Sequence, residues 1–308
     1  MNNTLLYVIT VLIWGSTWFA IEFQLGVVPP EVSIVYRYAG ASVLLFAWSG
    51  MRGLRLRFDR QAHGWFMVLG LFLFCLNYIF AYRAQIHITS AMCAIAFTAI
   101  VWLNILLARL FFGIRAGARV LTGAAIGIVG IIVLFAPRIG EVSLEDGVLF
   151  GSLLAVCGAF AASLGNMASQ KAQSLQLPVI QSNAWGMLYG AIFTATISAV
   201  EGHAFTFEAT AGYVISLLYL MIFGSIIAFG AYLTLLGRIG AHKAGYAMVL
   251  FPVVALLLSI LFEGLKLDLP ILAGTALVLA GNVFVLAGRP RMPRNPATPE
   301  HVILEGNE

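Results

Sequence analysis

Charged side chains are scarce in this sequence of 308 residues: Asp, Glu, Lys and Arg make up 10% of it, against 61% hydrophobic residues. The surface of a soluble domain needs about a quarter of its residues charged. The composition therefore excludes a soluble protein and predicts an integral membrane protein. In that setting the formal net charge of +4 reports which loops face the cytoplasm, and the sequence carries no motif for binding nucleic acid.

Groups for catalysis and for metal binding are also lacking. The three cysteines, Cys75, Cys93 and Cys157, lie inside apolar runs without metal-like spacing, so we expect them to be packing residues. No HExxH, no GxSxG and no paired Asp within an apolar run is present, and a P-loop lysine motif for ATP is missing. We therefore predict no enzyme activity, no cofactor and no metal site.

Long apolar runs are abundant, and each has about 20 residues, the length at which an α-helix crosses the hydrocarbon core of a bilayer. Short polar breaks, or breaks marked by Gly and Pro, separate the runs. The fold prediction is therefore an all-α protein with ten transmembrane helices. The predicted helices are Thr4–Ile21, Glu31–Gly50, His63–Tyr82, Thr89–Leu110, Gly117–Ala136, Gly147–Ser169, Ile180–Val200, Gly212–Leu236, His242–Phe262 and Pro270–Ala287.

Lysine and arginine are concentrated in alternate loops. Because positively charged loops are retained in the cytoplasm, these loops and both termini are predicted to be cytoplasmic. The other loops are mainly acidic, and their basic residues are only Arg83, Arg138 and Lys266. The basic set comprises Arg52, Arg55, Arg57, Arg60, Arg109, Arg115, Arg119, Lys171, Arg238, Lys243, Arg289, Arg291 and Arg294.

The second half of the chain repeats features of the first at a shift of 151 residues. Three glycines are in register, with Gly113, Gly123 and Gly130 matching Gly264, Gly274 and Gly281. A chance similarity between two apolar stretches is the alternative to a duplication. A duplication predicts five-helix halves at residues 1–138 and 147–288, joined by an outer loop at 139–146 and followed by a disordered cytoplasmic tail at 289–308.

Five crossings in each half, an odd number, give the second half the opposite orientation in the membrane. Inverted halves can open a path on one side while they close it on the other, so the predicted mechanism is alternating access of a transporter. A membrane scaffold without transport is the alternative from a different class of function. It predicts a core of interlocked apolar side chains with no solvated cavity.

Three stretches carry a resemblance to a known family: WGSTWFAIE at Trp14–Glu22, VVPPEVSIVYRYAGASVLL at Val27–Leu45, and LFEG followed by AGTALVLAG within Leu261–Gly281. In their order and spacing they resemble the EamA branch of the drug/metabolite transporter superfamily. Within that family the chain is most similar to the YddG-type exporters of aromatic amino acids. FFGIR at Phe111–Arg115 differs from the many members that carry a Glu after the glycine, so the role of that Glu is left open here.

The resemblance implies a carrier in the cell inner membrane, surrounded by lipid, with two inverted halves around a central cavity. The first, third, fourth, sixth, eighth and ninth helices would line the cavity, and the fifth and tenth would pack outside. The implied function is export of aromatic amino acids, extended to other neutral amino acids. A carrier for another small metabolite or for a cationic drug is the alternative within the same class.

Small residues indicate how the fifth and tenth predicted helices pack. Gly123 and Gly127 form a GxxxG motif, and Gly274 and Gly281 lie about two turns apart. Small residues let helix backbones approach closely in lipid. The contacts would lie either within the chain or in a homodimer.

Aromatic and polar side chains at helical spacing indicate a substrate pocket inside the bundle. Aromatic rings would hold an apolar side chain or a cation, and amides and hydroxyls would hold the ammonium and carboxylate of an amino acid. The alternatives are an interfacial aromatic belt and helix-to-helix packing. The candidate substrate-binding residues are Trp14, Thr17, Tyr78, Tyr82, Thr98, Trp102, Ser163, Asn166, Gln170, Tyr232 and Tyr246.

Arg37 and Pro252 are candidates for a gate and a hinge. Arg37 is a charge well inside a predicted helix, where it would either extend to the outer interface or pair with Glu22 or Glu31 at an outer gate. Pro252 lies in the middle of the ninth predicted helix, and its missing backbone hydrogen bond favours a kink. The first helix has no carboxylate before Glu22, so we expect facilitated or weakly coupled efflux.

The topology is testable with single cysteines introduced into two loops of a cysteine-free background. A cysteine in the Glu141–Asp146 loop should react with an impermeant maleimide added to intact cells. A cysteine in the Arg52–Arg60 loop should react only after the membrane is opened, because its arginines hold that loop in the cytoplasm. Reaction of an Arg52–Arg60 position from outside would contradict the inverted arrangement of the halves.

Overall fold

The predicted apolar runs form helices. The structure, a computed structural model, describes residues 2–113, 117–140, 147–232, 234–235 and 247–286, and these residues contain α- and π-helices and no strand. Each of the ten predicted ranges contains helix. The α-helices are α1 (Asn3–Glu22), α2 (Pro30–Met51), α3 (Arg60–Leu69), α4 (Asn77–Gln85), α5 (Ser90–Phe97), α6 (Ile100–Phe112), α7 (Ala118–Gly140), α8 (Val148–Ser174), α9 (Val179–Val200), α10 (Ala211–Tyr219), α12 (Ala247–Phe262) and α13 (Leu269–Leu286). The π-helices are η1 (Gly70–Leu76) and η2 (Leu220–Ile227).

Several of these helices have the length and composition of membrane spans. Within the described residues, six segments are long and apolar enough to cross a membrane: Asn3–Glu22, Pro30–Met51, Arg60–Gln85, Ser90–Phe112, Val148–Ser174 and Ala211–Tyr232. Leu121–Leu134, Leu250–Phe262 and Leu269–Phe284 are shorter apolar helices. The all-α membrane fold is thus confirmed, whereas the number of ten crossings stays a prediction.

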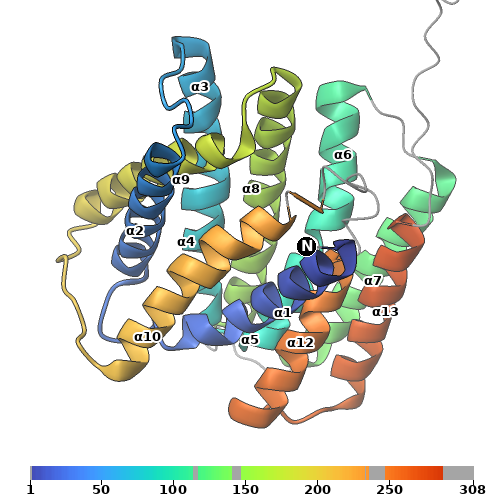
Figure 1. Ribbon diagram of the computed structural model, residues 1–308. Coiled ribbons are helices and arrows are strands. Elements are labelled where there is room, and N and C mark those ends of the chain that lie inside the picture. The colour runs from blue at the N-terminus through green and yellow to red at the C-terminus, as the bar shows by residue number, and fades with distance from the viewer. Residues whose placement is uncertain (1, 114–116, 141–146, 233, 236–246, 287–308) are drawn as a thin grey trace, which may run out of the picture.

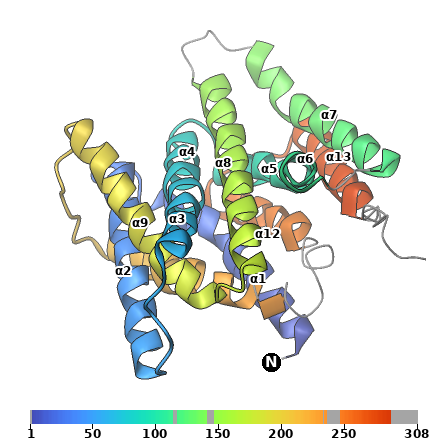
Figure 2. The ribbon, with the colours of Figure 1, turned by 90° about the horizontal axis from the view of Figure 1, so that it is seen from above.

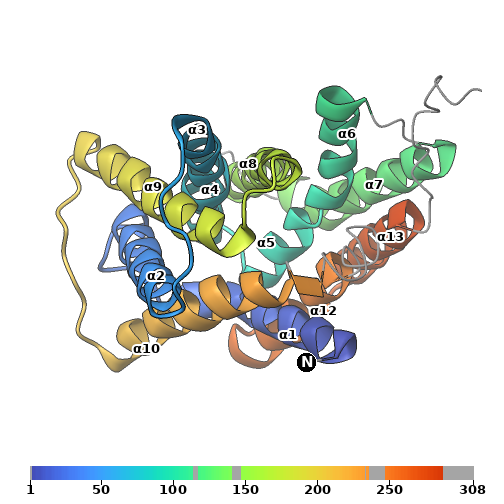
Figure 3. The same cartoon turned by 45° about the horizontal axis from the view of Figure 1, so that its top comes forward.

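Two pairs of helices form the flanks of the molecule. α7 and α13 lie side by side at one flank, and α2 and α9 lie together at the other, in all three views (Figure 1, Figure 2 and Figure 3). The remaining helices lie between the flanks, where α8 packs on α4 and α12 packs on α1. The place of α7 and α13 fits the outer packing expected of the fifth and tenth predicted helices.

Glycines bring α7 and α13 into backbone contact. A Cβ atom on Gly281 would lie 2.6 Å from the Gly123 carbonyl oxygen, and one on Gly130 would lie 2.9 Å from the Gly274 carbonyl oxygen. The contact is reciprocal, because the shift of 151 residues matches Gly123 with Gly274 and Gly130 with Gly281. Residue numbers rise along α7 while they fall along α13, so the two helices are antiparallel.

The two π-helices occupy corresponding places in the chain. η1 begins at Gly70 and η2 at Leu220, 150 residues later, and an α-helical segment follows each of them. π-Helices are rare, and they occur frequently at functional sites. In η2 the Leu220 carbonyl oxygen accepts a hydrogen bond from Ser225 Oγ at 3.0 Å.

The fourth predicted helix, Thr89–Leu110, is divided in the structure. α5 ends at Phe97 and α6 begins at Ile100. The amides of Thr98 and Ala99 bond back three residues, to the carbonyl oxygens of Ile95 and Ala96, and form a tight turn. Neither Gly nor Pro marks this break. α12 instead continues through Pro252, whose role as a hinge stays a prediction.

Replacement of Gly281 with leucine should destabilise the protein, because the new side chain would meet the backbone of α7. Overpacking of this kind costs about 1–3 kcal/mol, and we expect a clear fall in the midpoint of thermal unfolding in detergent. Gly230→Leu is the matched control, since nothing lies within 4 Å of the Cβ position at Gly230. Equal midpoints for the two variants would contradict the close α7–α13 contact.

Candidate functional site

A pocket lies among the central helices, and aromatic and polar side chains line it. The lining comes from α1, η1 with α4, α5 with α6, α8, residues 228–232 and α12, and a single residue comes from α9. The first six of these correspond to the predicted helices that the resemblance placed around a cavity. No charged side chain is part of the described lining. Its aromatic residues are Trp14, Trp18, Tyr78, Phe97, Phe229, Tyr232 and Phe251, and its polar residues are Thr17, Asn77, Asn166, Ser169 and Asn183.

Contacts between rings hold the aromatic wall in place before any ligand binds. The Trp14 ring lies 5.0 Å from Tyr232 and 5.2 Å from Phe229, between ring centroids. On the next turn of α1, Trp18 lies 4.8 Å from Phe97. The Trp14 indole nitrogen donates to the Gly224 carbonyl oxygen at 3.3 Å, which fixes the ring orientation. Such tilted ring pairs are favourable in themselves and leave ring faces for an apolar or aromatic ligand.

Asn77 and Asn166, two of the lining residues, are held by hydrogen bonds to the protein. The Asn77 Nδ2 donates to the Leu73 carbonyl oxygen at 3.0 Å, and the Asn77 Oδ1 is buried without a hydrogen-bond partner. The Asn166 Nδ2 donates to Asn104 Oδ1 at 3.2 Å, and Ser163 Oγ donates to the same oxygen at 2.6 Å. Each of these bonds uses one of the two hydrogens of an NH2 group, so both amides keep a second donor as well as an acceptor oxygen.

The structure brings five of the candidate residues to the pocket and places others elsewhere. Trp14, Thr17, Tyr78, Asn166 and Tyr232 belong to the lining, and their part in binding stays a prediction. Tyr246 lies outside the described residues, and Pro252 follows the lining residue Phe251.

Five candidates do not line the pocket, and each for a reason of local structure. Tyr82 is buried beneath it, with its hydroxyl 3.4 Å from Arg37 Nη1. Thr98 sits at the α5–α6 break and donates to Ile95 O at 2.7 Å. Trp102 lies beyond that break, which turns its side chain towards Gly127 of α7. Ser163 supports Asn104, and Gln170 is exposed.

Arg37 adopts neither of the two expected arrangements. Its side chain is 1% exposed, so it does not extend to an interface. Its Nε donates to Ser225 Oγ at 3.0 Å, and the described residues give it no carboxylate partner. Glu31 instead binds Arg83. The expected pairing with Glu22 or Glu31 was therefore wrong, because α2 directs Glu31 and Arg37 to different neighbours.

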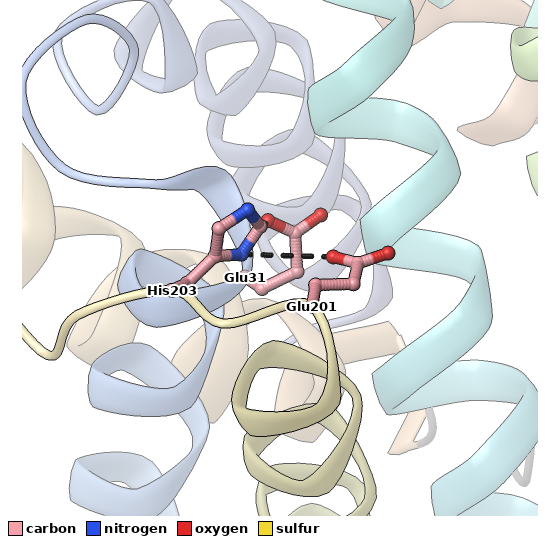
Figure 4. Close-up of side chains that lie close together, drawn as sticks. All are labelled: Glu31, Glu201 and His203. Carbon is pink, nitrogen blue, oxygen red and sulfur yellow. Dashed lines mark ion pairs between the residues drawn. The ribbon is translucent and has the colours of Figure 1, made fainter.

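A charged cluster joins three helices at the predicted outer end of the molecule. Arg83, at the end of α4, places Nε 2.6 Å from Glu31 Oε1 and Nη2 2.6 Å from Glu201 Oε2. His203 Nδ1 lies 3.4 Å from Glu31 Oε2 and 3.6 Å from Glu201 Oε2. Glu31, Glu201 and His203 point towards one another (Figure 4) and offer metal-ligand atoms. Arg83 already supplies a cation to both carboxylates, so we assign the cluster a structural role.

Loss of the Arg83 charge should destabilise the protein, because Glu31 is 1% exposed and would lose its cation. Arg83→Gln should cost about 1–3 kcal/mol, the penalty for a buried polar group left unpaired. Glu201→Gln should cost less, since that partner is one-third exposed. Thermal unfolding in detergent measures both effects. Adding Glu31→Gln to Arg83→Gln should recover part of the loss, and an Arg83→Gln variant as stable as the native chain would contradict the assignment.

Comparison with known proteins finds a transporter family and several relatives that are named as transporters. The EamA-like transporter family matches residues 3–136 and 149–287. A protein of Escherichia coli (strain K12) named "Uncharacterized inner membrane transporter YedA" is 27% identical over 286 residues, which cover 92% of this chain and 90% of YedA. A protein of Bacillus subtilis (strain 168) named "Uncharacterized transporter YoaV" is 24% identical, and the match covers 94% of this chain and 99% of YoaV. An Escherichia coli (strain K12) protein named "Probable amino-acid metabolite efflux pump" is 25% identical, covering 94% of this chain and 97% of its own length.

One solved crystal structure has the same fold. It superposes on this chain with a TM-score of 0.67 at 20% sequence identity. The match covers 92% of this chain and 95% of the other. At this identity the likeness concerns the fold alone.

Proposed function

This chain belongs to the EamA-like transporter family, and from that premise we propose that it exports aromatic and other neutral amino acids by alternating access of two inverted halves. The protein is a multi-pass membrane transporter, as its family and the relatives named as inner membrane transporters indicate. The family also points to transport rather than catalysis. The substrate and the mechanism are the parts that we propose.

The composition of the pocket carries the substrate proposal. Its rings suit an apolar or aromatic side chain, and its amide oxygens suit an ammonium group. A small amphipathic solute such as phenylalanine combines these two features. A scaffold with an interlocked apolar core fits less well, because it gives no reason to leave the Asn77 oxygen unpaired at a pocket.

Three observations support two inverted halves at residues 1–138 and 147–288. The family matches the chain as two segments that lie within these bounds. The α7–α13 contact is reciprocal and antiparallel, as a two-fold axis between inverted halves requires. The π-helices begin at Gly70 and Leu220, at corresponding places of the two halves.

Removal of a pocket ring should reduce the preference for aromatic substrates. Phe229→Ala should weaken phenylalanine relative to threonine by about 1 kcal/mol, or about five-fold in apparent affinity, for one lost ring contact. Counterflow of radiolabelled amino acids in proteoliposomes measures the ratio. Trp102→Ala is the matched control, because that ring packs towards α7 and not into the pocket.

The control variant Trp102→Ala should change the apparent affinities for phenylalanine and threonine equally. A selective loss of phenylalanine in Trp102→Ala, together with an unchanged ratio in Phe229→Ala, would place the aromatic subsite elsewhere. Transport of neither amino acid by the native chain would refute the proposed substrate class.

A further inference from the structure

Arg37 is a buried positive charge to which the described residues give no countercharge. Its side chain is 1% exposed. Its polar partners are Ser225 Oγ at 3.0 Å and the Tyr82 hydroxyl at 3.4 Å, and both of them are neutral. Its Cζ also lies 4.6 Å from the centroid of the Tyr78 ring. Unpaired charges inside a membrane protein are costly and mark sites of function.

The charge lies directly behind the wall of the pocket. Tyr78, which stacks on the guanidinium, is a lining residue, and so is Thr17. Gly224 of η2 lies between Thr17 and Arg37. A Cβ atom on Gly224 would lie 3.2 Å from Arg37 Nη2 and 2.8 Å from Thr17 Cγ2. Because Gly224 has no side chain, nothing at this position shields the pocket from the guanidinium.

Neither the lining nor the guanidinium's own neighbours cancel this charge. The described lining holds no Asp or Glu, and the described hydrogen bonds of Arg37 use Nε and Nη1 and leave Nη2 beside Gly224. Because Arg37 itself is 1% exposed, its field is screened less than that of a charge in bulk water. A carboxylate near Thr17 and Tyr78 is therefore attracted, and a cation there is repelled.

An amino acid also carries an ammonium group, which needs a hydrogen-bond acceptor, and Asn77 can provide one. Its Oδ1 is buried and unpaired while its Nδ2 is committed to Leu73 O. This oxygen can accept a hydrogen bond from an ammonium group. The lining thus combines residues in front of a positive charge with an amide whose oxygen is unpaired.

We propose that Arg37 is the specificity-determining residue that makes this transporter require a carboxylate on its substrate and reject cations. This rests on the proposed function and narrows it. The carboxylate lies against the Thr17–Tyr78 wall in front of Arg37, and the ammonium group is held by Asn77. Amines that lack a carboxylate are excluded, and the carrier of a cationic drug, the alternative within the same class, is disfavoured.

Three compounds with one shared ring separate the charge requirements. Phenylalanine carries both charges at neutral pH, 3-phenylpropionate carries only the carboxylate, and phenethylamine carries only the ammonium. Each is tested as an unlabelled competitor of phenylalanine counterflow in proteoliposomes, and for binding by its effect on thermal unfolding of the purified protein. In the native chain 3-phenylpropionate should compete at least about ten-fold better than phenethylamine, the size expected for one weakly screened charge.

Variants of Arg37 and Asn77 should change this order in opposite ways. Arg37→Gln should lose about ten-fold in affinity for 3-phenylpropionate and gain affinity for phenethylamine, whereas Arg37→Lys keeps the charge and should keep the native order. Asn77→Leu should weaken phenylalanine and spare 3-phenylpropionate, because it removes the amide that accepts from the ammonium group. If Arg37→Gln does not fold, the native competition order still tests the predicted rejection of cations, and equal competition by the two compounds overturns it.

The outcomes separate this inference from the proposed function. Equal competition by phenethylamine and 3-phenylpropionate in the native chain, or an unchanged order in folded Arg37→Gln, overturns the role of Arg37 even if phenylalanine is transported. If the native chain does not transport phenylalanine but binds 3-phenylpropionate better than phenethylamine, and loses that order in Arg37→Gln, the role of Arg37 stands and the amino-acid substrate fails.

Discussion

Close approach of helix backbones at glycine is the constraint on which the rest of the structure depends. Lipid provides no hydrophobic drive for helix association, so contact and dispersion must hold the bundle together. A Cβ atom on Gly70 would lie 2.6 Å from Gly186 O, and one on Gly15 would lie 2.9 Å from Phe251 O. The first contact sets α9 against η1, and the second sets α1 against α12. The walls of the pocket therefore take their positions from residues that have no side chain.

Buried polar atoms without a hydrogen-bond partner occur both in the pocket lining and elsewhere in this molecule. Several buried hydroxyls of the helices bond to the preceding turn, as Thr10 Oγ1 does with Leu6 O at 2.8 Å. Several buried polar atoms have no partner, among them Ser198 Oγ and Thr275 Oγ1. Within the described residues, only the Asn77 oxygen among these atoms belongs to a residue of the pocket lining. An unpaired atom of a lining residue is closer to a ligand than one between packed helices.

Sequence reasoning recovered the helices better than the site, and the physical reasons differ. Hydrophobic runs report burial in lipid directly, so every predicted range contains helix. The α5–α6 break contains neither Gly nor Pro, and the glycines of the two π-helices, Gly70 and Gly224, do not distinguish them from an uninterrupted α-helix. Thr98 and Trp102 are four residues apart and would share a face in one continuous helix. The α5–α6 break lies between α5 and Trp102, so these two side chains do not form a common surface. Asn77 was missed because a lone amide next to Tyr78 has no periodic pattern.

The geometry of α2 explains why Glu31 and Arg37 do not pair with each other. Both are 1% exposed and both lie on α2, six residues apart. At 3.6 residues per turn, six residues turn a helix by about 240° beyond a full circle, so the two side chains leave different faces. Glu31 meets Arg83 of α4, whereas Arg37 meets Ser225 of η2 and the Tyr78 ring. The helix thus commits its own acidic residue to a basic residue elsewhere, and among the described residues Arg37 has no carboxylate partner beside the pocket.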